Sequence, residues 1–469
     1  MKTEAFRNQA HELVDWIADY MDGVRDYPVK AQVKPGEVRA KLGHKPPLEG
    51  EDFSDVVDDF KTIILPGITH WQHPRFMAYF PANGTPESQL AEMLISALGV
   101  NAMLWETSPA ATELEEEMMA WLGGMIGVPE NWSGVIQDTA STATFCAVLA
   151  ARERATDWKV NAQGLTAVAP LAFYTTAQSH SSIEKAVKMA GLGLSSIRHV
   201  PVDDELKILP AELQAMIEAD KAAGVIPAGV IISVGSTGVG ACDPVRAVAE
   251  ITNQHNLYLH VDAAWAGSAL VCPEYQHLID GIELADSFVF NPHKWMGIQF
   301  DCSAHFVKDK STLIRTLTIL PEYLKTREGD TVTDYRDWGP QLGRRIRALK
   351  VWFVLRGQGV RAIQQRIRNH VQWAETLAQT IAETEGYKIC SKPILSLFSF
   401  RYEPAGSADL DDLNQRLVHA INDAGFTYVT KTLLDGRPVI RLQIGQTNTT
   451  WDDVDAVWSH IKATAAAME

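Results

Sequence analysis

The sequence predicts an α/β protein built on a mostly parallel central sheet with flanking helices. Between residues 134 and 290, short and almost wholly apolar segments alternate with longer amphipathic stretches. Such segments predict strands that are buried on both faces, and buried strands separated by helices are typical of a parallel sheet. The expected strands lie at residues 134–137, 171–174, 197–202, 230–234, 257–261 and 288–290.

Helical periodicity fills the intervals between these strands. Each interval is long enough for the helix that must connect one parallel strand to the next. The α/β part therefore extends over residues 85–349 and forms a large ligand-binding domain. Its helices are expected at residues 90–98, 112–125, 141–154, 181–190, 210–222 and 342–355.

The N-terminal segment, residues 1–84, is expected to be a helical flap. Its first helix places Phe6, Leu13 and Ile17 on one face, and Pro66-Gly67 ends a second helical stretch. The segment is too small to enclose a core of its own. We therefore expect its apolar face to be buried on a second subunit, in a homodimer.

The C-terminal segment, residues 350–469, predicts a small α+β domain. Apolar segments at 394–400 and 438–444 alternate with helical stretches at 410–424 and 450–468. Such a mixture of helices and few strands is typical of a separate layer packed beside a larger sheet.

Composition excludes several classes of protein. The 469-residue chain has a net charge of −16, which argues against nucleic acid or anionic membranes as partners, because both attract cationic surfaces. Its five cysteines are scattered and odd in number, so we expect no disulfide framework, no metal site and a reducing, cytoplasmic compartment. The polar N-terminus is not a signal peptide, and no apolar run of about 18 residues predicts a membrane span.

Two strand ends carry the most informative residues. Lys294 follows the expected strand at 288–290 through Asn-Pro-His, and Asp262 ends the expected strand at 257–261. Carboxyl ends of parallel strands form the ligand-binding edge of such a sheet. A lysine that can form a Schiff base and a carboxylate that can pair with a pyridinium nitrogen are the groups needed to hold pyridoxal phosphate. Each residue alone is as readily explained by a structural or solvated side chain.

Further polar residues follow other strands of the same sheet. Residues 137–142 open a helix whose N-terminus would bind a phosphate, or whose residues are a simple N-cap. His180 would stack on a cofactor ring, or merely begin a helix. Residues 235–238 form either a turn or one wall of a flat ligand site, and Asn291 and His293 bind either ligand or loop. Their coincidence at one sheet edge favours a cofactor site.

Several sequence motifs together resemble those of a known enzyme family. The segments around Asn291-Pro-His-Lys294, His260-Val-Asp262 and Gln178-Ser-His180 resemble the group II pyridoxal-phosphate-dependent decarboxylases, and within them the aromatic L-amino-acid decarboxylases. Matching segments occur in order along nearly the whole chain. The resemblance implies a fold-type I homodimer with shared active sites, pyridoxal 5′-phosphate as cofactor, and decarboxylation of an aromatic L-amino acid to its amine and CO2.

The resemblance also implies roles for individual residues. Lys294 would carry the cofactor, Asp262 would pair with its ring nitrogen, and Tyr323 would protonate the carbanion left by decarboxylation. His180 would stack on the ring, and His293 would lie beside the Schiff base. The remaining cofactor contacts would be Ala140, Ser141, Thr237, Ala264, Asn291, Leu342 and Gly343. The substrate contacts would be Trp71, Tyr79, Phe80, Pro81, Ala82, Asn101, Met103, Thr237 and Gly343.

Departures from the family pattern leave the substrate open. Animal members have threonine at the position of Ala82, so one partner of a catechol hydroxyl is missing here, and Asn101 would supply another. Gly343 resembles relatives that leave room for indoles. Tryptophan, phenylalanine, tyrosine and dopa all remain candidates, whereas an apolar, aromatic surround disfavours glutamate.

Two other functions remain as alternatives. One is an aromatic aldehyde synthase, which would use the same cofactor with O2. Plant members of that class have phenylalanine at the position of Tyr323, and insect members have asparagine at the position of His180. The other is a non-catalytic scaffold that binds the cofactor, against which the intact set of Lys294, Asp262, His180 and Tyr323 argues.

Overall fold

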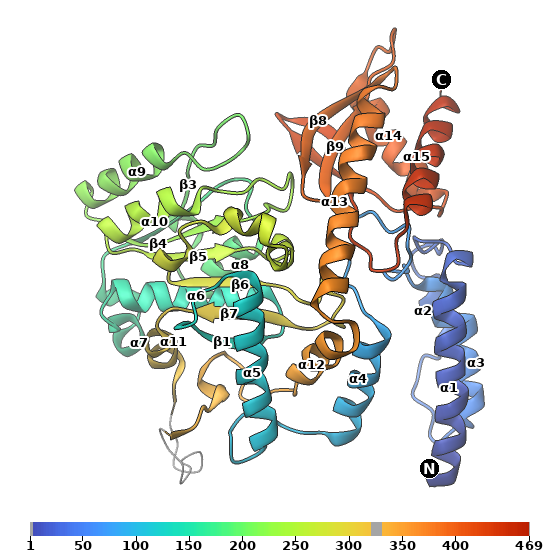
Figure 1. Cartoon of the computed structure of the whole chain (residues 1–469), viewed down its shortest axis with the longest axis horizontal. Helices are drawn as coiled ribbons and strands as arrows, with labels where there is room; N and C mark the ends of the chain where they lie inside the picture. Colours follow the sequence, from blue (N-terminus) through green and yellow to red (C-terminus); the bar gives the residue numbers. More distant parts are fainter. Residues whose placement is uncertain (1–2, 320–330, 469) are drawn as a thin grey trace. The chain divides into compact units, whose positions relative to one another are not determined.

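The computed structural model describes residues 3–319 and 331–468, which divide into two compact units. One unit consists of residues 82–372 and 393–398, and the other of residues 1–81, 373–392 and 399–469. Figure 1 shows the chain coloured along its sequence. We describe each unit by itself.

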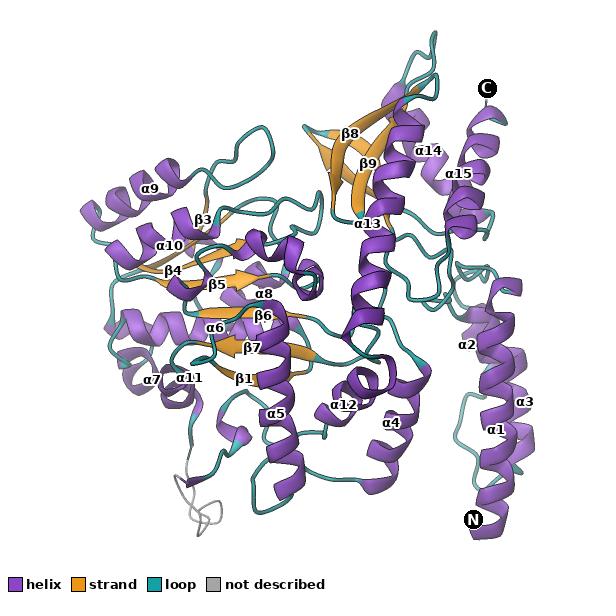
Figure 2. Cartoon of the chain, viewed as in Figure 1, coloured by secondary structure: helices purple, strands orange, loops and turns teal. Residues whose placement is uncertain are grey.

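The larger unit, residues 82–372 with 393–398, contains a seven-stranded sheet (Figure 2). Its strand order is β1-β7-β6-β5-β4-β2-β3. Strands β2 to β6 pair in parallel, whereas β7 is antiparallel to both of its neighbours, β6 and β1. The strands are β1 Ser133–Gln137, β2 Leu171–Thr175, β3 Ile197–His199, β4 Ile226–Ser233, β5 Tyr258–Asp262, β6 Ser287–Phe290 and β7 Ser303–Val307.

The predicted fold class, with its mostly parallel sheet, is confirmed. Every residue of β2, β5 and β6 is buried, as their apolar sequences require. Strand β7 was not among the expected strands, although all five of its residues are buried as well. Its sequence contains the polar residues Ser303 and His305, and a prediction based on apolar segments therefore missed this strand.

Helices connect the parallel strands and cover the sheet. The helices α6 and α8 pack on β2 and β4 through a buried apolar cluster that includes Val148, Phe173, Ile183 and Ile231. The helices of this unit include α4 Pro86–Leu98, α5 Pro109–Ile126, α6 Ala140–Ala155, α7 Lys159–Gln163, α8 Ser182–Met189, α9 Pro210–Ala222, α10 Val245–Gln254, α11 Lys310–Leu317 and α12 Ala348–Gln358.

Sequence signals at helix ends agree with the structure at α4 and α5. Thr85 and Ser108 cap these helices with their side chains, and a proline occupies the first turn of each. The expected helix at 342–355 is wrong at its start, because α12 begins only at Ala348. Residues 339–347 instead form an irregular segment whose backbone bonds to a neighbouring loop, as when Ala102 donates to the carbonyl of Arg344 at 2.8 Å.

The smaller unit contains a four-stranded sheet of order β10-β11-β9-β8. Its N-terminal residues pair with its C-terminal ones, since Val29 donates to Gly425 at 2.7 Å and Met77 to Tyr428 at 2.9 Å. The division into three domains, with boundaries at residues 84 and 349, stays a prediction. Three elements contribute residues to both units, namely α13 Val360–Ala382, β8 Tyr387–Ile394 and β9 Leu397–Tyr402. The other elements of the smaller unit are α1 Thr3–Gly23, α2 Glu37–Lys41, α3 Phe53–Asp59, α14 Leu410–Asp423, β10 Thr430–Leu434, β11 Arg437–Gln443 and α15 Trp451–Ala466.

Hydropathy along the helices gives a further result. Within residues 3–319 and 331–468, no helix combines the length and the apolar character needed to cross a membrane.

Candidate cofactor site

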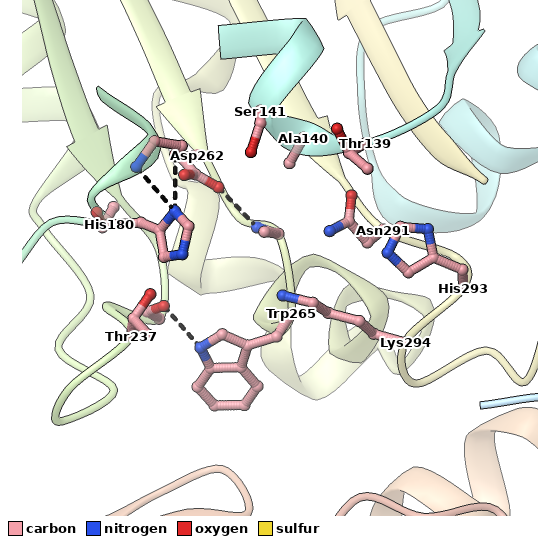
Figure 3. Close-up of a pocket in the computed structure, with 14 residues that line it drawn as sticks. Thr139, Ala140, Ser141, His180, Thr237, Asp262, Trp265, Asn291, His293 and Lys294 are labelled. Carbon is pink, nitrogen blue, oxygen red and sulfur yellow. Dashed lines mark hydrogen bonds between the residues drawn. The ribbon is translucent and has the colours of Figure 1, made fainter. Parts of the chain in front are cut away.

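A cavity of about 190 Å³ lies at the carboxyl ends of the parallel strands in the larger unit (Figure 3). It is the place at which an open parallel sheet binds its ligand. Residues from the ends of β2, β4, β5 and β6 and from the start of α6 form its walls. The lining residues are Thr139, Ala140, Ser141, His180, Ser182, Ser233, Gly235, Thr237, Asp262, Ala264, Trp265, Asn291, His293 and Lys294.

Asp262, the last residue of β5, supplies a buried carboxylate to this cavity. Its Oδ1 accepts a hydrogen bond from the backbone N–H of Ala264 at 3.0 Å. Burial raises the pKa of Asp262 above its usual range, and the Ala264 N–H, His180 and Lys294 oppose that rise. A carboxylate in such a place is stabilised as an anion by a cation bound in the cavity.

His180 follows β2 and presents an exposed ring to the cavity. Its Nδ1 accepts a hydrogen bond from the backbone N–H of Ser182 at 3.1 Å and lies 2.7 Å from the Ser182 hydroxyl. Desolvation lowers the pKa of His180, and the charges of Lys294 and Lys185 act in the same direction, while Asp262 opposes them. The side chain is therefore a flat, neutral imidazole held in one orientation.

The start of α6 forms an anion-binding corner of the cavity. Ala140 and Ser141 occupy the first turn, where backbone N–H groups have no partner within the helix. Asn291 lies beside them, and its Oδ1 accepts from the hydroxyl of Ser303 at 2.7 Å (Figure 3). That bond leaves the amide NH2 as the end of Asn291 that donates to a ligand. Strand β7, which carries Ser303, thus orients a residue of the site.

Lys294 extends its amine into the cavity (Figure 3). Its backbone is fixed on both sides, because its N–H donates to the carbonyl of Asn291 at 2.9 Å and its own carbonyl accepts from Asn83 Nδ2 at 2.7 Å. A lysine on so rigid a segment delivers its amine to a defined place. Near a bound aldehyde, that amine would form a Schiff base.

Trp265 is a lining residue that the sequence did not single out. Its indole N–H donates to the carbonyl of Gly235 at 2.6 Å, which joins the end of β5 to the turn after β4. Gly235 has a φ of +85°, and a Cβ there would lie 2.5 Å from the Cβ of Ala266. Only glycine fits this close approach. The signal that identifies Trp265 is its place three residues after Asp262.

The cavity unites most of the predicted cofactor contacts but, of the predicted substrate contacts, only Thr237. Ala140, Ser141, His180, Thr237, Asp262, Ala264, Asn291, His293 and Lys294 all line it. Leu342, Gly343, Ala82, Asn101 and Met103 belong to the same unit without lining the cavity, and Trp71, Tyr79, Phe80 and Pro81 belong to the other unit. Tyr323 lies outside the described residues.

Comparison with known proteins decides the family. Residues 35–403 match the family model described as the pyridoxal-dependent decarboxylase conserved domain. The chain belongs to this family. The resemblance predicted from the motifs is confirmed, and so is pyridoxal phosphate as the cofactor of this pyridoxal-dependent decarboxylase.

Similar proteins cover this decarboxylase from end to end. It is 39% identical to aromatic-L-amino-acid decarboxylase of Rattus norvegicus, with 100% of this chain and 99% of the relative aligned. It is 38% identical to tyrosine decarboxylase 4 of Petroselinum crispum (100% and 94% aligned). It is also 38% identical to phenylacetaldehyde synthase of Arabidopsis thaliana (100% and 97% aligned). The crystal structure of Catharanthus roseus tryptophan decarboxylase with L-tryptophan superposes with a TM-score of 0.94 at 36% identity, over 100% of this chain and 99% of that one.

The donor set of the cavity fits pyridoxal phosphate. The cofactor combines an aldehyde, a basic ring nitrogen and a phosphate on one flat ring. The cavity supplies an amine, a buried carboxylate and a helix N-terminus with an amide donor, together with a flat imidazole. Each chemical group of the cofactor therefore has a counterpart among the lining residues.

Proposed function

We propose that this pyridoxal-dependent decarboxylase converts aromatic L-amino acids into arylalkylamines and CO2. The observation that carries the proposal is that Lys294, Asp262 and the first turn of α6 line one cavity. When bound, pyridoxal phosphate supplies an electron sink for the carbanion that loss of CO2 leaves. The protein must hold the cofactor, keep its ring nitrogen protonated and return one proton to the substrate carbon.

Individual residues take roles in this proposal. Lys294 holds the aldehyde carbon of the cofactor, and Asp262 holds a proton on the ring nitrogen, because a buried anion favours a cation beside it. Ala140, Ser141 and Asn291 bind the phosphate. His180 supports the ring with its flat face, in line with its exposure to the cavity and its fixed orientation.

For the substrate we propose an aromatic side chain rather than an acidic one. In the smaller unit Trp71 and Tyr79 are 39% and 48% exposed, and their rings stack at 5.7 Å. The Tyr79 hydroxyl lies 3.3 Å from that of Tyr428. Exposed aromatic rings of this kind bind aromatic groups, whereas a glutamate side chain would need a cationic partner. We retain Trp71, Tyr79, Phe80 and Pro81 as proposed substrate contacts, together with Ala82, Asn101, Met103 and Gly343 of the larger unit.

A substrate panel tests the proposal. The purified holoenzyme is incubated with tryptophan, phenylalanine, tyrosine, dopa and glutamate, and amine and CO2 are quantified by chromatography. We expect equimolar amine and CO2 from at least one aromatic substrate. Faster turnover of glutamate than of all four aromatic substrates would overturn the proposal, and so would the absence of any CO2.

A second candidate function is oxidative, namely formation of an aromatic aldehyde, ammonia and peroxide in place of the amine. The 38% identity to an Arabidopsis thaliana phenylacetaldehyde synthase is the observation that keeps it open. The tyrosine at position 323 and the histidine at position 180 favour the amine-forming reaction. Aldehyde and peroxide measured in the same incubations separate the two reactions.

We further propose a homodimer with shared active sites. Helix α1 has no buried residue, and α4 exposes Leu90, Met93, Leu94 and Leu98 on one face. Exposed apolar side chains that gather on one helix face are typical of surfaces that are covered in an assembly. Sedimentation velocity at assay concentration tests the proposal, and a fully active monomer would contradict it.

A further inference from the structure

His293, the residue before Lys294, has its tautomer fixed by the backbone. The N–H of Cys302 donates to Nδ1 of His293 at 2.9 Å, and the N–H of His293 donates to the carbonyl of Cys302 at 3.3 Å. A backbone N–H only donates, so Nδ1 is an acceptor and the single proton of the neutral ring lies on Nε2. In Figure 3 one ring nitrogen of His293 is turned toward Asn291 and Lys294.

The surroundings of His293 keep its ring neutral. The side chain is 3% exposed, and the ring of Phe300 lies against it with centroids 4.8 Å apart. Burial, together with the charges of Lys294 and Lys350, lowers the pKa of His293 to about 3, against the opposing effects of Asp301 and of the hydrogen bond with the Cys302 backbone. His293 is therefore a hydrogen-bond donor toward the cavity throughout the neutral pH range.

A buried lysine holds the peptide group that fixes this tautomer. Lys350, on α12, is 0% exposed, and its Nζ donates to the carbonyls of Gln299 at 2.9 Å and Asp301 at 2.8 Å. Its Nζ also lies 2.6 Å from Glu92 Oε1, an ion pair whose angles fall outside those of a hydrogen bond. An ammonium group is costly to bury, and these contacts offset that cost.

One planar peptide group connects Lys350 to His293. The carbonyl of Asp301 and the N–H of Cys302 belong to the same peptide unit, which is rigid because its C–N bond has double-bond character. The ammonium that binds the oxygen therefore sets the direction of the N–H. It also withdraws electron density from the peptide and makes that N–H a stronger donor, as in other hydrogen-bonded chains.

Other contacts hold the same turn, residues 299–302, without reaching this peptide oxygen. The N–H of Gln299 donates to the hydroxyl of Ser88 at 2.6 Å, and Arg347 Nε donates to the carboxylate of Asp301 at 2.8 Å. Lys350 differs from them because its partner is the oxygen of the peptide that faces His293.

We propose that Lys350 is a positioning residue, and that through the Asp301–Cys302 peptide it holds His293 as a neutral imidazole with Nε2–H directed at the cavity. His293 then serves as a fixed hydrogen-bond donor beside Lys294 and not as a general base. The inference deepens the proposed function, because it assigns the chemistry of one residue of that site, but the tautomer exists whether or not the reaction is the proposed one.

Nitrogen NMR of the cofactor-free protein tests the proposal directly. The protein is labelled with 15N-histidine, and His293→Gln identifies the signals of that ring in a long-range 1H–15N spectrum. We expect the wild type to show a protonated Nε2 and an unprotonated, hydrogen-bonded Nδ1 that do not change between pH 5 and 8. In Lys350→Met we expect a mixture of tautomers and a ring that titrates within this range.

Arg345→Ala is the matched control. Arg345 also pairs with Glu92, but its side chain is 47% exposed. Within the described residues it makes no hydrogen bond or ion pair with the 299–302 turn, although its charge helps to lower the pKa of Asp301. We expect wild-type His293 signals in this variant. A change in Arg345→Ala equal to that in Lys350→Met would assign the effect to Glu92 and overturn the role of Lys350.

A second variant covers the case in which Lys350→Met does not fold. Lys350→Gln keeps a similar length and an N–H donor but removes the charge that polarises the peptide, so His293 is again expected to titrate. Wild-type His293 signals in whichever of the two variants folds would overturn the proposal.

The holoenzyme gives a second readout. In either variant we expect kcat to fall about tenfold at pH 6, with an added acidic limb in its pH profile and KM within about twofold of the wild type. The reason is that a protonated Nδ1 cannot accept from the Cys302 N–H, so a charged and unfixed ring replaces a neutral, fixed donor. If the enzyme proves not to decarboxylate aromatic amino acids, this readout fails while the NMR result stands, so the two failures are distinguishable.

Discussion

The carboxylate of Asp262 accepts a hydrogen bond from the backbone N–H of Ala264 at 3.0 Å, only two residues further along the chain. The bond holds the carboxylate at the point where β5 ends. Because burial raises the pKa of Asp262 above its usual range, the cofactor-free site is poised to take up a cation. A protonated ring nitrogen meets that requirement.

Asp262→Asn is expected to weaken cofactor binding and catalysis together. A neutral amide cannot hold a proton on the ring nitrogen, so kcat should fall by at least ~100-fold, which is about 2.7 kcal/mol of activation free energy. Cofactor affinity is measured by titrating the cofactor-free protein, and turnover by release of CO2. Asp220→Asn serves as the control, since Asp220 binds Arg198 and Tyr174 away from the cavity and should affect stability alone. An Asp262→Asn enzyme with wild-type kcat would remove Asp262 from the proposal.

Lys294→Ala is expected to lower kcat by at least ~1,000-fold, or about 4 kcal/mol of barrier, because the covalent link to the cofactor is lost. Borohydride reduction of the wild-type holoenzyme followed by tryptic mapping should place the cofactor on the peptide that contains Lys294. Lys185→Ala is a suitable control, since Lys185 lies near His180 but does not line the cavity. Cofactor recovered on any other lysine would refute the assignment.

Tyr323→Phe separates the two candidate reactions. Tyr323 lies outside the described residues, and the expectation comes from the family resemblance of its segment. A phenol would return the proton to the substrate carbon in a site that excludes water. Without it, the variant should bind the cofactor normally, form little amine and divert flux to aldehyde, ammonia and peroxide. An unchanged amine yield, with no peroxide in a coupled peroxidase assay, would show that Tyr323 takes no part.

The sequence predicted the parallel strands and most of the residues that line the cavity, because both have a strong local signature. Short apolar runs such as the one before Asp262 are typical of buried strands, and the polar residues that follow parallel strands meet at one sheet edge. Lys294 and Asp262 were found in this way, and both line the cavity.

Residues whose role depends on distant partners were missed for a physical reason. Lys350 lies within a helix, where a lysine normally indicates a solvated face, yet it is fully buried against carbonyls some fifty residues earlier in the chain. His305 and Ser303 made β7 look too polar to be a strand, although Ser303 orients Asn291. Local periodicity contains no information about such partners, so only the fold reveals them.

His305, in the middle of β7, supports a prediction about stability in acid. It is fully buried, and neither ring nitrogen has a hydrogen-bond partner among the described residues. Desolvation lowers the pKa of His305 to about 4. The folded protein thus keeps the ring neutral below the pKa of about 6.5 that an unfolded chain has.

The sign of the effect follows from proton binding. Above about pH 6.5 neither state binds the proton, so His305 does not change stability with pH. Between about pH 6.5 and the folded pKa of about 4, only the unfolded chain is protonated, and the free energy of unfolding falls by about 1.4 kcal/mol per pH unit. Acid therefore destabilises the fold through this one residue by roughly 3 kcal/mol at most.

His305→Leu should remove this acid-dependent loss of stability, and leucine fills a similar volume. Because it also removes two buried polar atoms without partners, we expect little change in the free energy of unfolding at pH 7.5 and a gain of about 2 kcal/mol over the wild type at pH 4.5. Urea unfolding of the cofactor-free protein at the two pH values measures the difference. His277→Leu is the control, since it makes the same replacement at an exposed position. Equal losses of stability in His305→Leu and the wild type between pH 7.5 and 4.5 would show that His305 is protonated as readily in the folded protein as in the unfolded chain.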